Sequence, residues 1–357
     1  MMNRRVIFSL AIAAVSAGNV FAQTPKTARA NKSAAPNYVA IVSHEADRRV
    51  DVLVGGKPFT AYIWPASLKK PVLYPIHSAN GATVTRGFPL DPRPGERVDH
   101  PHHAGLWFNY GDVNGLDFWN NSDSIKAANA PKMGTIVHRS VRSTKSGAGE
   151  GSLDVTDEWV DYANKPLLKE DTHFVFRAKD GVRTIDRITT LTALDGPVSF
   201  TDNKEGVIGM RVARSLEQPS LTPEKYTDAS GRVTDVAKLD TAGVHGHYLS
   251  SEGKEGDAVW GTRGKWTMLT GDVSGAPVTL AILDHPKNIG YPTYWHARGY
   301  GLFAANPLGQ KALSGGKEEL NFRLMAGKSV TFRHQVLILD KTATAADIED
   351  YYAGFSR

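Results

Sequence analysis

Alternation of apolar and polar side chains, at a period of two residues, constrains this chain more than any other feature. In residues 329–339, every second side chain from Val330 to Ile338 points to one side of a predicted strand, and those between point to the other. Gly, Pro and Asn interrupt such segments at short intervals. The pattern predicts a β-rich chain, and so many strands need two packed sheets.

Two tight turns help to set the predicted strands. Residues 50–54 and 58–64 flank Gly55-Gly56, whose freedom at positive φ suits a hairpin turn. Asn80-Gly81 gives the same signal between residues 73–76 and 83–88. Further strands are predicted at residues 135–141, 153–160, 172–177, 183–194, 198–202, 206–212, 266–270, 278–283, 301–305, 319–324 and 329–339.

One helix is predicted, at the end of the chain. Thr344 can cap it and Asp347 can reach back to the cap, while Ile348, Tyr351 and Tyr352 form an apolar stripe. Residues 120–132 and 217–241 lack periodicity and are predicted to be long loops over the sheet. The predicted fold class is therefore all-β: one large antiparallel β-sandwich over residues 37–357, with long loops and a short C-terminal helix.

The first residues are typical of an export signal. A basic start at Arg4 and Arg5 precedes an apolar run from Val6 to Val15, so residues 1–22 are predicted to be a cleaved signal peptide and 23–36 a disordered segment. The expected location is the periplasm or the medium of a bacterium, with no membrane attachment after cleavage. The chain has no Cys, which excludes disulfides, a thiol nucleophile and Cys-ligated zinc.

Charge and missing motifs exclude several function classes. The formal charge of +5 is spread along the chain without a Lys/Arg block, so no nucleic-acid partner is expected. The sequence has no phosphate-binding Walker loop, dinucleotide fingerprint, G-x-S-x-G elbow or H-E-x-x-H helix.

Chemistry-bearing residues are densest in the segment 99–119. His100, His102 and His103 can bind metal or move protons near neutral pH, and Trp107 offers a flat face for a sugar ring. Pro101 disfavours a helix, so an extended backbone is expected to place His100 and His102 on one face and His103 on the other. The His100-x-His102 pair could hold a metal, but no carboxylate follows closely, and metal-free recognition, acid–base work or a purely structural role stay open.

Two further segments add matching side chains. Residues 284–298 join histidines to aromatics, and residues 201–211 hold a carboxylate and an arginine beside glycines. A Pro-anchored turn and a structural ion pair are the plain alternatives. The predicted catalytic residues are His100, His102, His103, Glu205 and His296, and the predicted substrate-binding residues are Trp107, Asp112, Asp117, Arg211, Tyr294, Trp295 and Arg298.

Four stretches carry a family resemblance across nearly the whole mature chain: HPHHAGLWFNYGDVNGLDFW, DNKEGVIGMRVA, GYPTYWHARGYGLFAANPLG and AGKSVTFRHQVLI. They resemble the PmoA-like family of exported bacterial proteins, which is named after a methane oxygenase. A membrane-bound monooxygenase subunit spans the bilayer several times, and this mature chain has no predicted span. The C-terminal strand, Ala-Gly-Lys-Ser and strand also resemble galactose-mutarotase-like supersandwich domains, which implies sugar binding on a concave sheet by His, Arg and carboxylates.

The sequence leaves three functions open. The first is a secreted carbohydrate-active enzyme, a hydrolase, lyase or epimerase, that acts on a sugar or glycan by His/carboxylate acid–base chemistry without a cofactor. The second is a non-catalytic glycan-binding protein that uses the same aromatics. The third is a metal-dependent oxygenase with the His100/His102 pair as ligands. Nothing in the sequence indicates the sugar, the bond or the oligomeric state.

Overall fold

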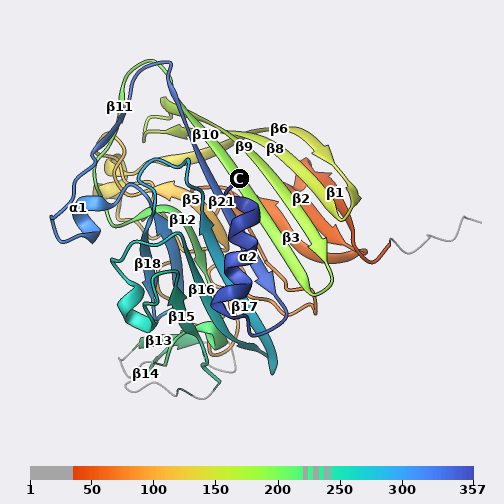
Figure 1. Cartoon of the computed structure of the whole chain (residues 1–357). Coiled ribbons are helices and arrows are strands. Elements are labelled where there is room, and N and C mark those ends of the chain that lie inside the picture. Colours follow the sequence, from red (N-terminus) through yellow and green to blue (C-terminus); the bar gives the residue numbers. More distant parts are fainter. Residues whose placement is uncertain (1–34, 220–223, 228–232, 237–240, 242) are drawn as a thin grey trace, which may run out of the picture. The chain divides into compact units, whose positions relative to one another are not determined.

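Two large antiparallel sheets, which contain most of the predicted strands, dominate the computed structural model (Figure 1). The structure describes residues 35–219, 224–227, 233–236, 241 and 243–357. Residues Ala34–Arg357 form one compact unit. The predicted signal peptide, residues 1–22, and all but the last two residues of the predicted disordered segment, residues 23–36, lie outside the described residues.

The first sheet has nine strands in the order β18-β19-β12-β5-β4-β3-β2-β1-β7. Their bounds are β1 Tyr38–His44, β2 Arg49–Val54, β3 Lys57–Ile63, β4 Val72–Leu73, β5 Leu106–Tyr110, β7 Gly147–Ala148, β12 Gly206–Arg211, β18 Tyr294–Arg298 and β19 Leu302–Asn306. The strands at one end of this sheet come from distant parts of the chain, which brings the second half of the sequence beside residues 106–110.

The second sheet has eight strands in the order β15-β16-β17-β21-β10-β9-β8-β6. Their bounds are β6 Thr135–Lys145, β8 Glu150–Val160, β9 Pro166–Lys179, β10 Val182–Ala193, β15 His247–Ser250, β16 Trp266–Val273, β17 Ala276–Asp284 and β21 Ser329–Leu339.

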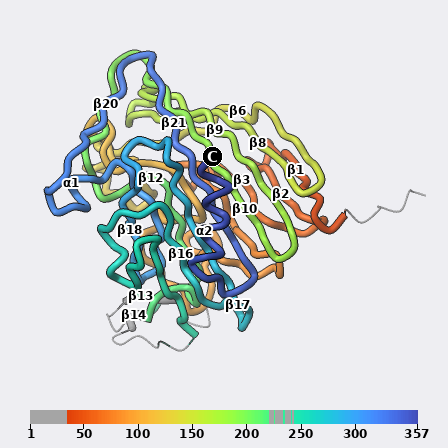
Figure 2. Tube along the Cα trace, in the orientation of Figure 1, coloured from red at the N-terminus to blue at the C-terminus, as the bar shows by residue number. Residues whose placement is uncertain are grey.

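Short elements complete the unit. Two small sheets pair β11 (Val198–Phe200) with β20 (Phe322–Leu324) and β13 (Glu224–Thr227) with β14 (Val233–Val236); Figure 2 shows them at opposite ends. The helices are η1 Glu45–Asp47, η2 Ala127–Lys132, η3 Arg214–Leu216, η4 Gly256–Val259, α1 Gln310–Leu313 and α2 Ala345–Phe355. In the described part of the chain, no helix has the length and apolarity needed to cross a bilayer.

Aromatic rings from both large sheets meet in one core. Phe108 of β5 lies 5.6 Å from Phe332 of β21, and Phe59 of β3 lies 6.2 Å from Phe176 of β9, measured between ring centroids. These contacts are those of two sheets packed face to face. The predicted all-β sandwich is therefore confirmed.

The C-terminal helix closes the outer side of the second sheet. Thr344 and Asp347 form a capping box at the start of α2, as predicted. Ile348 and Tyr352 are buried against Leu337 and Leu339 of β21, and Figure 1 shows α2 lying across these strands. This cover explains why the C-terminal half of β21 is buried on both faces.

Local turn signals gave mixed results. Gly55 and Gly56 have φ values of 57° and 79° and join β2 to β3, so this hairpin prediction is confirmed. Around Asn80-Gly81 the chain turns, but the paired segments make only isolated bridges such as His77 with Thr83. The predicted loop 217–241 contains the β13–β14 hairpin in its described part, so that loop prediction was wrong there.

Gly105 leads from the histidine segment into β5 and should tolerate no side chain. Its φ is +60°, and a Cβ atom there would lie 2.3 Å from the Leu73 carbonyl oxygen. We expect Gly105→Ala to lower the free energy of unfolding by about 2–4 kcal/mol, because a left-handed backbone and an overpacked contact add. Urea denaturation measures the loss. Gly56→Ala is the control, since Gly56 has φ +79° and no neighbour within 4 Å of the added atom; equal losses would contradict the packing argument.

Candidate functional site

Register places side chains from four strands on one face of the nine-stranded sheet. Gly209 of β12 lies opposite Trp107 of β5 and Ala304 of β19, and Ala304 lies opposite His296 of β18. Residues directly opposite in a ladder share a face. This face lies on the side of the sheet away from the main core, and we call it the outer face. Arg211 and Arg298, both opposite Leu302, share it.

Asp99 joins two buried arginines at this outer face. Arg86 Nη1 and Arg211 Nη2 both donate to Asp99 Oδ1, over 2.6 and 2.7 Å. Both guanidinium groups are fully buried, whereas the Asp99 side chain is 19% exposed. Burial opposes ionisation of Asp99, but the hydrogen bond from His100 and the charges of Arg211 and Arg86 outweigh it and hold the pKa of Asp99 well below its usual value.

Four rings stack in a nearly parallel column beside Asp99. Tyr300, His100, His103 and Trp107 follow one another with centroid distances of 5.2, 4.8 and 5.1 Å and interplanar angles of 3°, 3° and 13°. His100 has φ 44° and its carbonyl accepts from the His103 N–H, so the segment turns instead of extending. The expected extended arrangement, with His100 and His103 on opposite faces, was therefore wrong.

His103 is locked inside this column. Trp119 Nε1 donates to its Nε2 over 3.2 Å, Arg211 Nη1 lies 3.3 Å from its Nδ1, and only 1% of the residue is exposed. Burial, followed by the nearby His102 and Arg211, lowers the pKa of His103 far below its usual value. The ring is therefore neutral and holds the stack in place, closed to solvent.

His102 packs edge-on against the column, with its ring centroid 4.3 Å from that of His103. Its carbonyl accepts from Lys70 Nζ over 2.7 Å, and its own Nε2 is buried without a hydrogen-bond partner in the described structure. Burial, followed by the charge of Lys70, lowers the pKa of His102 to about 2. Burial likewise lowers the pKa of Lys70 to about 7.

A second group, Glu205 with His296, lies on the same face. Glu205 Oε2 lies 3.6 Å from His296 Nδ1, and this nitrogen is 3.0 Å from the Lys204 carbonyl oxygen. Because a carbonyl only accepts, Nδ1 carries the proton and Nε2 carries the lone pair. Nε2 has no hydrogen-bond partner among the described residues.

Burial moves the pKa values of this pair in opposite directions. Burial raises the pKa of Glu205, and it lowers the pKa of His296 to about 3, with Arg298 contributing the next largest effect. The charge of His100 acts on both groups, so the ring column and the Glu205–His296 pair belong to one electrostatic cluster. Tyr300 lies in the turn between β18 and β19, and the charges of Glu205 and Arg298 both affect the pKa of its hydroxyl group.

Five predicted binding residues have structural surroundings: three are buried, and two accept hydrogen bonds from backbone N–H groups in turns. Trp107 and Trp295 are fully buried. Asp112 accepts from the Gly115 N–H, and Asp117 accepts from the N–H groups of Trp119 and Asn120. Tyr294 is 4% exposed and packs under Arg263 at 5.2 Å. Trp107 still supports the site, as the inner end of the ring column.

Several residues of the cluster were not identified from the sequence. Arg86, Lys70, Lys204, Tyr300 and Trp260 were not predicted. Tyr300 follows Arg298 in a Gly-flanked turn, a signal that could have marked it. Arg86 gave no signal, because its partner Asp99 lies 13 residues away across an irregular loop.

No metal centre is evident in the described part of the chain. No group of three or more His, Asp or Glu side chains there has an arrangement that could hold an ion. His100 and His102 meet edge to face at 5.6 Å, and a metal on this pair stays a prediction.

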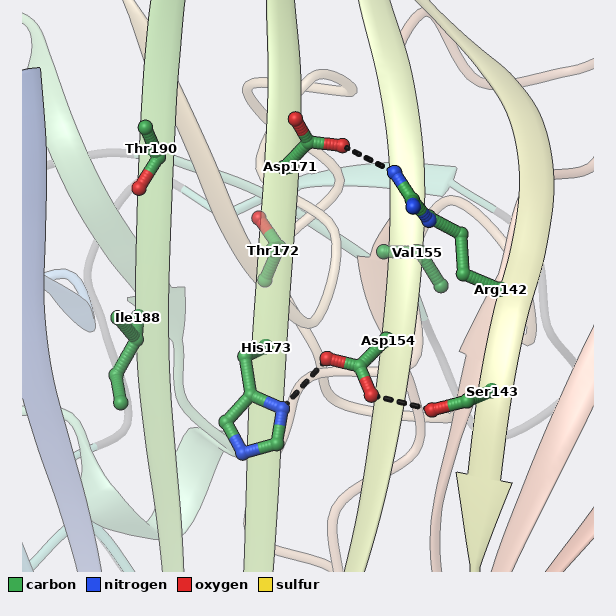
Figure 3. Close-up of a pocket in the computed structure, with 9 residues that line it drawn as sticks. All are labelled: Arg142, Ser143, Asp154, Val155, Asp171, Thr172, His173, Ile188 and Thr190. Atoms are coloured by element: carbon green, nitrogen blue, oxygen red, sulfur yellow. Dashed lines mark hydrogen bonds and ion pairs between the residues drawn. The ribbon is translucent and has the colours of Figure 1, made fainter. Parts of the chain in front are cut away.

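Figure 3 shows a different polar hollow, of about 450 Å³, on the outer side of the eight-stranded sheet. Asp154 accepts from Ser143 Oγ and lies 2.6 Å from His173 Nδ1, so the carboxylate stands between the hydroxyl and the imidazole. A nucleophile needs its base within direct reach. This row is therefore a cross-strand polar ladder and not a catalytic triad.

Comparison with known proteins gives a family. The model of a family of unknown function, DUF6807, matches residues 49–353. The chain belongs to the DUF6807 family. The comparison with curated proteins gives no match to this DUF6807 chain. Because the matched family carries no function, the resemblance to PmoA-like proteins stays a prediction.

Solved structures that match this chain include two alpha-galactosidases and a putative aldose 1-epimerase. The galactosidase domain of the alpha-galactosidase-sucrose kinase AgaSK is 10% identical over 86% of the DUF6807 chain and 42% of its own, with a TM-score of 0.39. The GH36 alpha-galactosidase AgaB from Geobacillus stearothermophilus is 10% identical over 85% and 41%, with a TM-score of 0.38. A putative aldose 1-epimerase from Escherichia coli K12 is 11% identical over 84% and 98%, with a TM-score of 0.29. The chain thus spans about two fifths of the length of these galactosidase structures.

Proposed function

We propose that this protein is a carbohydrate-active enzyme that uses Glu205 and His296 as its acid–base pair. One observation carries the proposal: a carboxylate and an imidazole lie 3.6 Å apart on a sheet face, with pKa values shifted in opposite directions by burial. Two titratable groups separated in this way can divide the roles of acid and base at one pH.

The roles follow from protonation. Because the pKa of His296 is about 3, its Nε2 is unprotonated at neutral pH and can accept a proton from a sugar hydroxyl, a ring carbon or water. Burial raises the pKa of Glu205, and its side chain, 16% exposed, is the group of the pair that would supply a proton to a leaving oxygen. His100, 41% exposed, presents an open ring edge at the start of the column.

The substrate contact would come from the exposed end of the stack. Tyr300 and His100 lie in parallel planes at 5.2 Å, and flat rings of this kind pack against the apolar face of a sugar. The proposal includes export of the protein, which rests on the sequence of residues 1–22 alone.

The test is turnover of a panel of mono- and oligosaccharides, followed by mass spectrometry for cleavage and by NMR for epimerisation. We expect Glu205→Gln and His296→Asn each to lower kcat by about 10²- to 10⁴-fold, with nearly unchanged melting temperatures. His173→Gln is the control, because His173 is 41% exposed and lies on the other sheet. Full turnover by both site variants would refute the acid–base assignment.

A non-catalytic glycan-binding protein is the second candidate. The Tyr300–His100 stack favours it, because stacking alone can bind a sugar. Saturable glycan binding without any product from the panel would replace the enzyme proposal with this one.

A further inference from the structure

Arg298 carries a positive charge that no carboxylate of the described structure balances. Among the described residues, its guanidinium group contacts the ring of Trp260, whose centroid lies 4.7 Å from the guanidinium carbon. Arg263, which is also partly exposed and also lies over an aromatic ring, has an acidic partner in Glu318. Arg298 is partly exposed, so its charged group remains reachable.

The position of Arg298 relates it to the acid–base pair. Arg298 and His296 are two residues apart on β18, so they share the outer face at a spacing of about 7 Å along the strand. Lys204, 53% exposed, adds a second cation 3.6 Å from Glu205. Positive charge therefore exceeds negative charge among the four side chains on this face, which are Arg298, His296, Lys204 and Glu205.

The ring of Trp260 lies against the guanidinium group of Arg298. A cation over an indole face is attracted by the ring and loses part of its rotational freedom before any ligand arrives. The exposed edge of such a group offers parallel N–H donors, which match the two oxygens of a carboxylate. A neutral sugar has no group that would offset this charge.

We propose that Arg298 binds the carboxylate of an acidic sugar, so that the substrates of this site are uronic acids or uronate-containing glycans. The inference rests on the proposed function and names its substrate class. A sulfated sugar offers a similar anion, but its three oxygens are not planar and fit the guanidinium fork less well.

The experiment compares ligands and variants by calorimetric titration. Glucuronate and galacturonate oligosaccharides are titrated beside their methyl esters, their neutral counterparts and a sulfated analogue. We expect the uronates to bind at least tenfold more tightly than the esters and neutral sugars. Arg298→Gln should remove this preference, Arg298→Lys should keep part of it, and Arg323→Gln, an exposed arginine on β20, should change nothing.

Each result decides a separate point. Equal binding of uronate and ester, or an equal loss of both in Arg298→Gln, overturns the inference, and preference for the sulfated sugar overturns the carboxylate assignment. If a neutral sugar is turned over, and Glu205→Gln and His296→Asn abolish this turnover while Arg298→Gln does not, the inference fails while the proposed function stands. If uronates bind through Arg298 but no product forms, the enzymatic function fails while the binding specificity stands.

Discussion

Replacing Glu170 with Ala is expected to lower the free energy of unfolding by about 3–5 kcal/mol. Glu170 lies in the core between the sheets, 1% exposed, and accepts from Arg187 Nη2 over 2.6 Å. It also accepts from Trp159 Nε1 and from the Thr172 hydroxyl. The variant would leave the Arg187 guanidinium, 5% exposed, without its counter-charge in an apolar region.

Chemical denaturation with matched variants checks this expectation. Glu158→Ala is the control, because Glu158 forms an ion pair with Arg139 in which the side chains are 28% and 44% exposed, and such pairs contribute at most about 1 kcal/mol. Adding Arg187→Met to Glu170→Ala should restore part of the loss, since the stranded charge is removed. A loss no greater than that of the control would show that the buried pair is not important for stability.

Asp99→Ala is expected to cost a comparable amount, about 3–5 kcal/mol. Its carboxylate is the acceptor that Arg86 and Arg211 share, and without it two buried guanidinium groups would face each other. Arg86 keeps backbone acceptors such as the His103 carbonyl, whereas Arg211 keeps its contact with His103 Nδ1 and its place over the Tyr300 ring, 4.8 Å from the centroid. The greater part of the loss should therefore come from Arg211.

The cost of Asp99→Ala should depend on pH. The pKa of Asp99 in the folded protein lies below the value of 3.8 for the free side chain. The unfolded chain then binds the proton first, so the stabilisation is complete above about pH 4 and is lost as the pH falls further. Urea melts at pH 7 and pH 3 should show a smaller difference between the variant and the original protein at pH 3. A difference independent of pH would contradict the charge argument.

Sequence patterns predicted the structure correctly where interactions between neighbouring residues determine it. Gly55-Gly56 and the Thr344 capping box needed only neighbouring residues, and both were predicted correctly. β18 was not predicted, because Tyr294, Trp295 and His296 are all buried and show no alternation of apolar and polar residues.

The candidate site depended on pairings that sequence spacing does not encode. Arg211 meets Asp99 across 112 positions, and the four-ring column requires a turn at His100 with positive φ. The sequence predicted that Trp107 offers a flat face to a sugar ring but could not show that Trp119 and Leu302 pack against it. The residue types were informative, whereas their exposure was decided by tertiary packing.

The strand order β18-β19-β12-β5 also determines when the candidate site exists at all. Asp99, Arg211 and Tyr300 come together only after the last strands of the sheet have joined those from the first third of the chain. A partly assembled molecule has no complete site, so a ligand of this site would bind the assembled protein alone and stabilise it by mass action. Ligand binding at this site and completion of the fold are therefore thermodynamically coupled, because the same side chains take part in both.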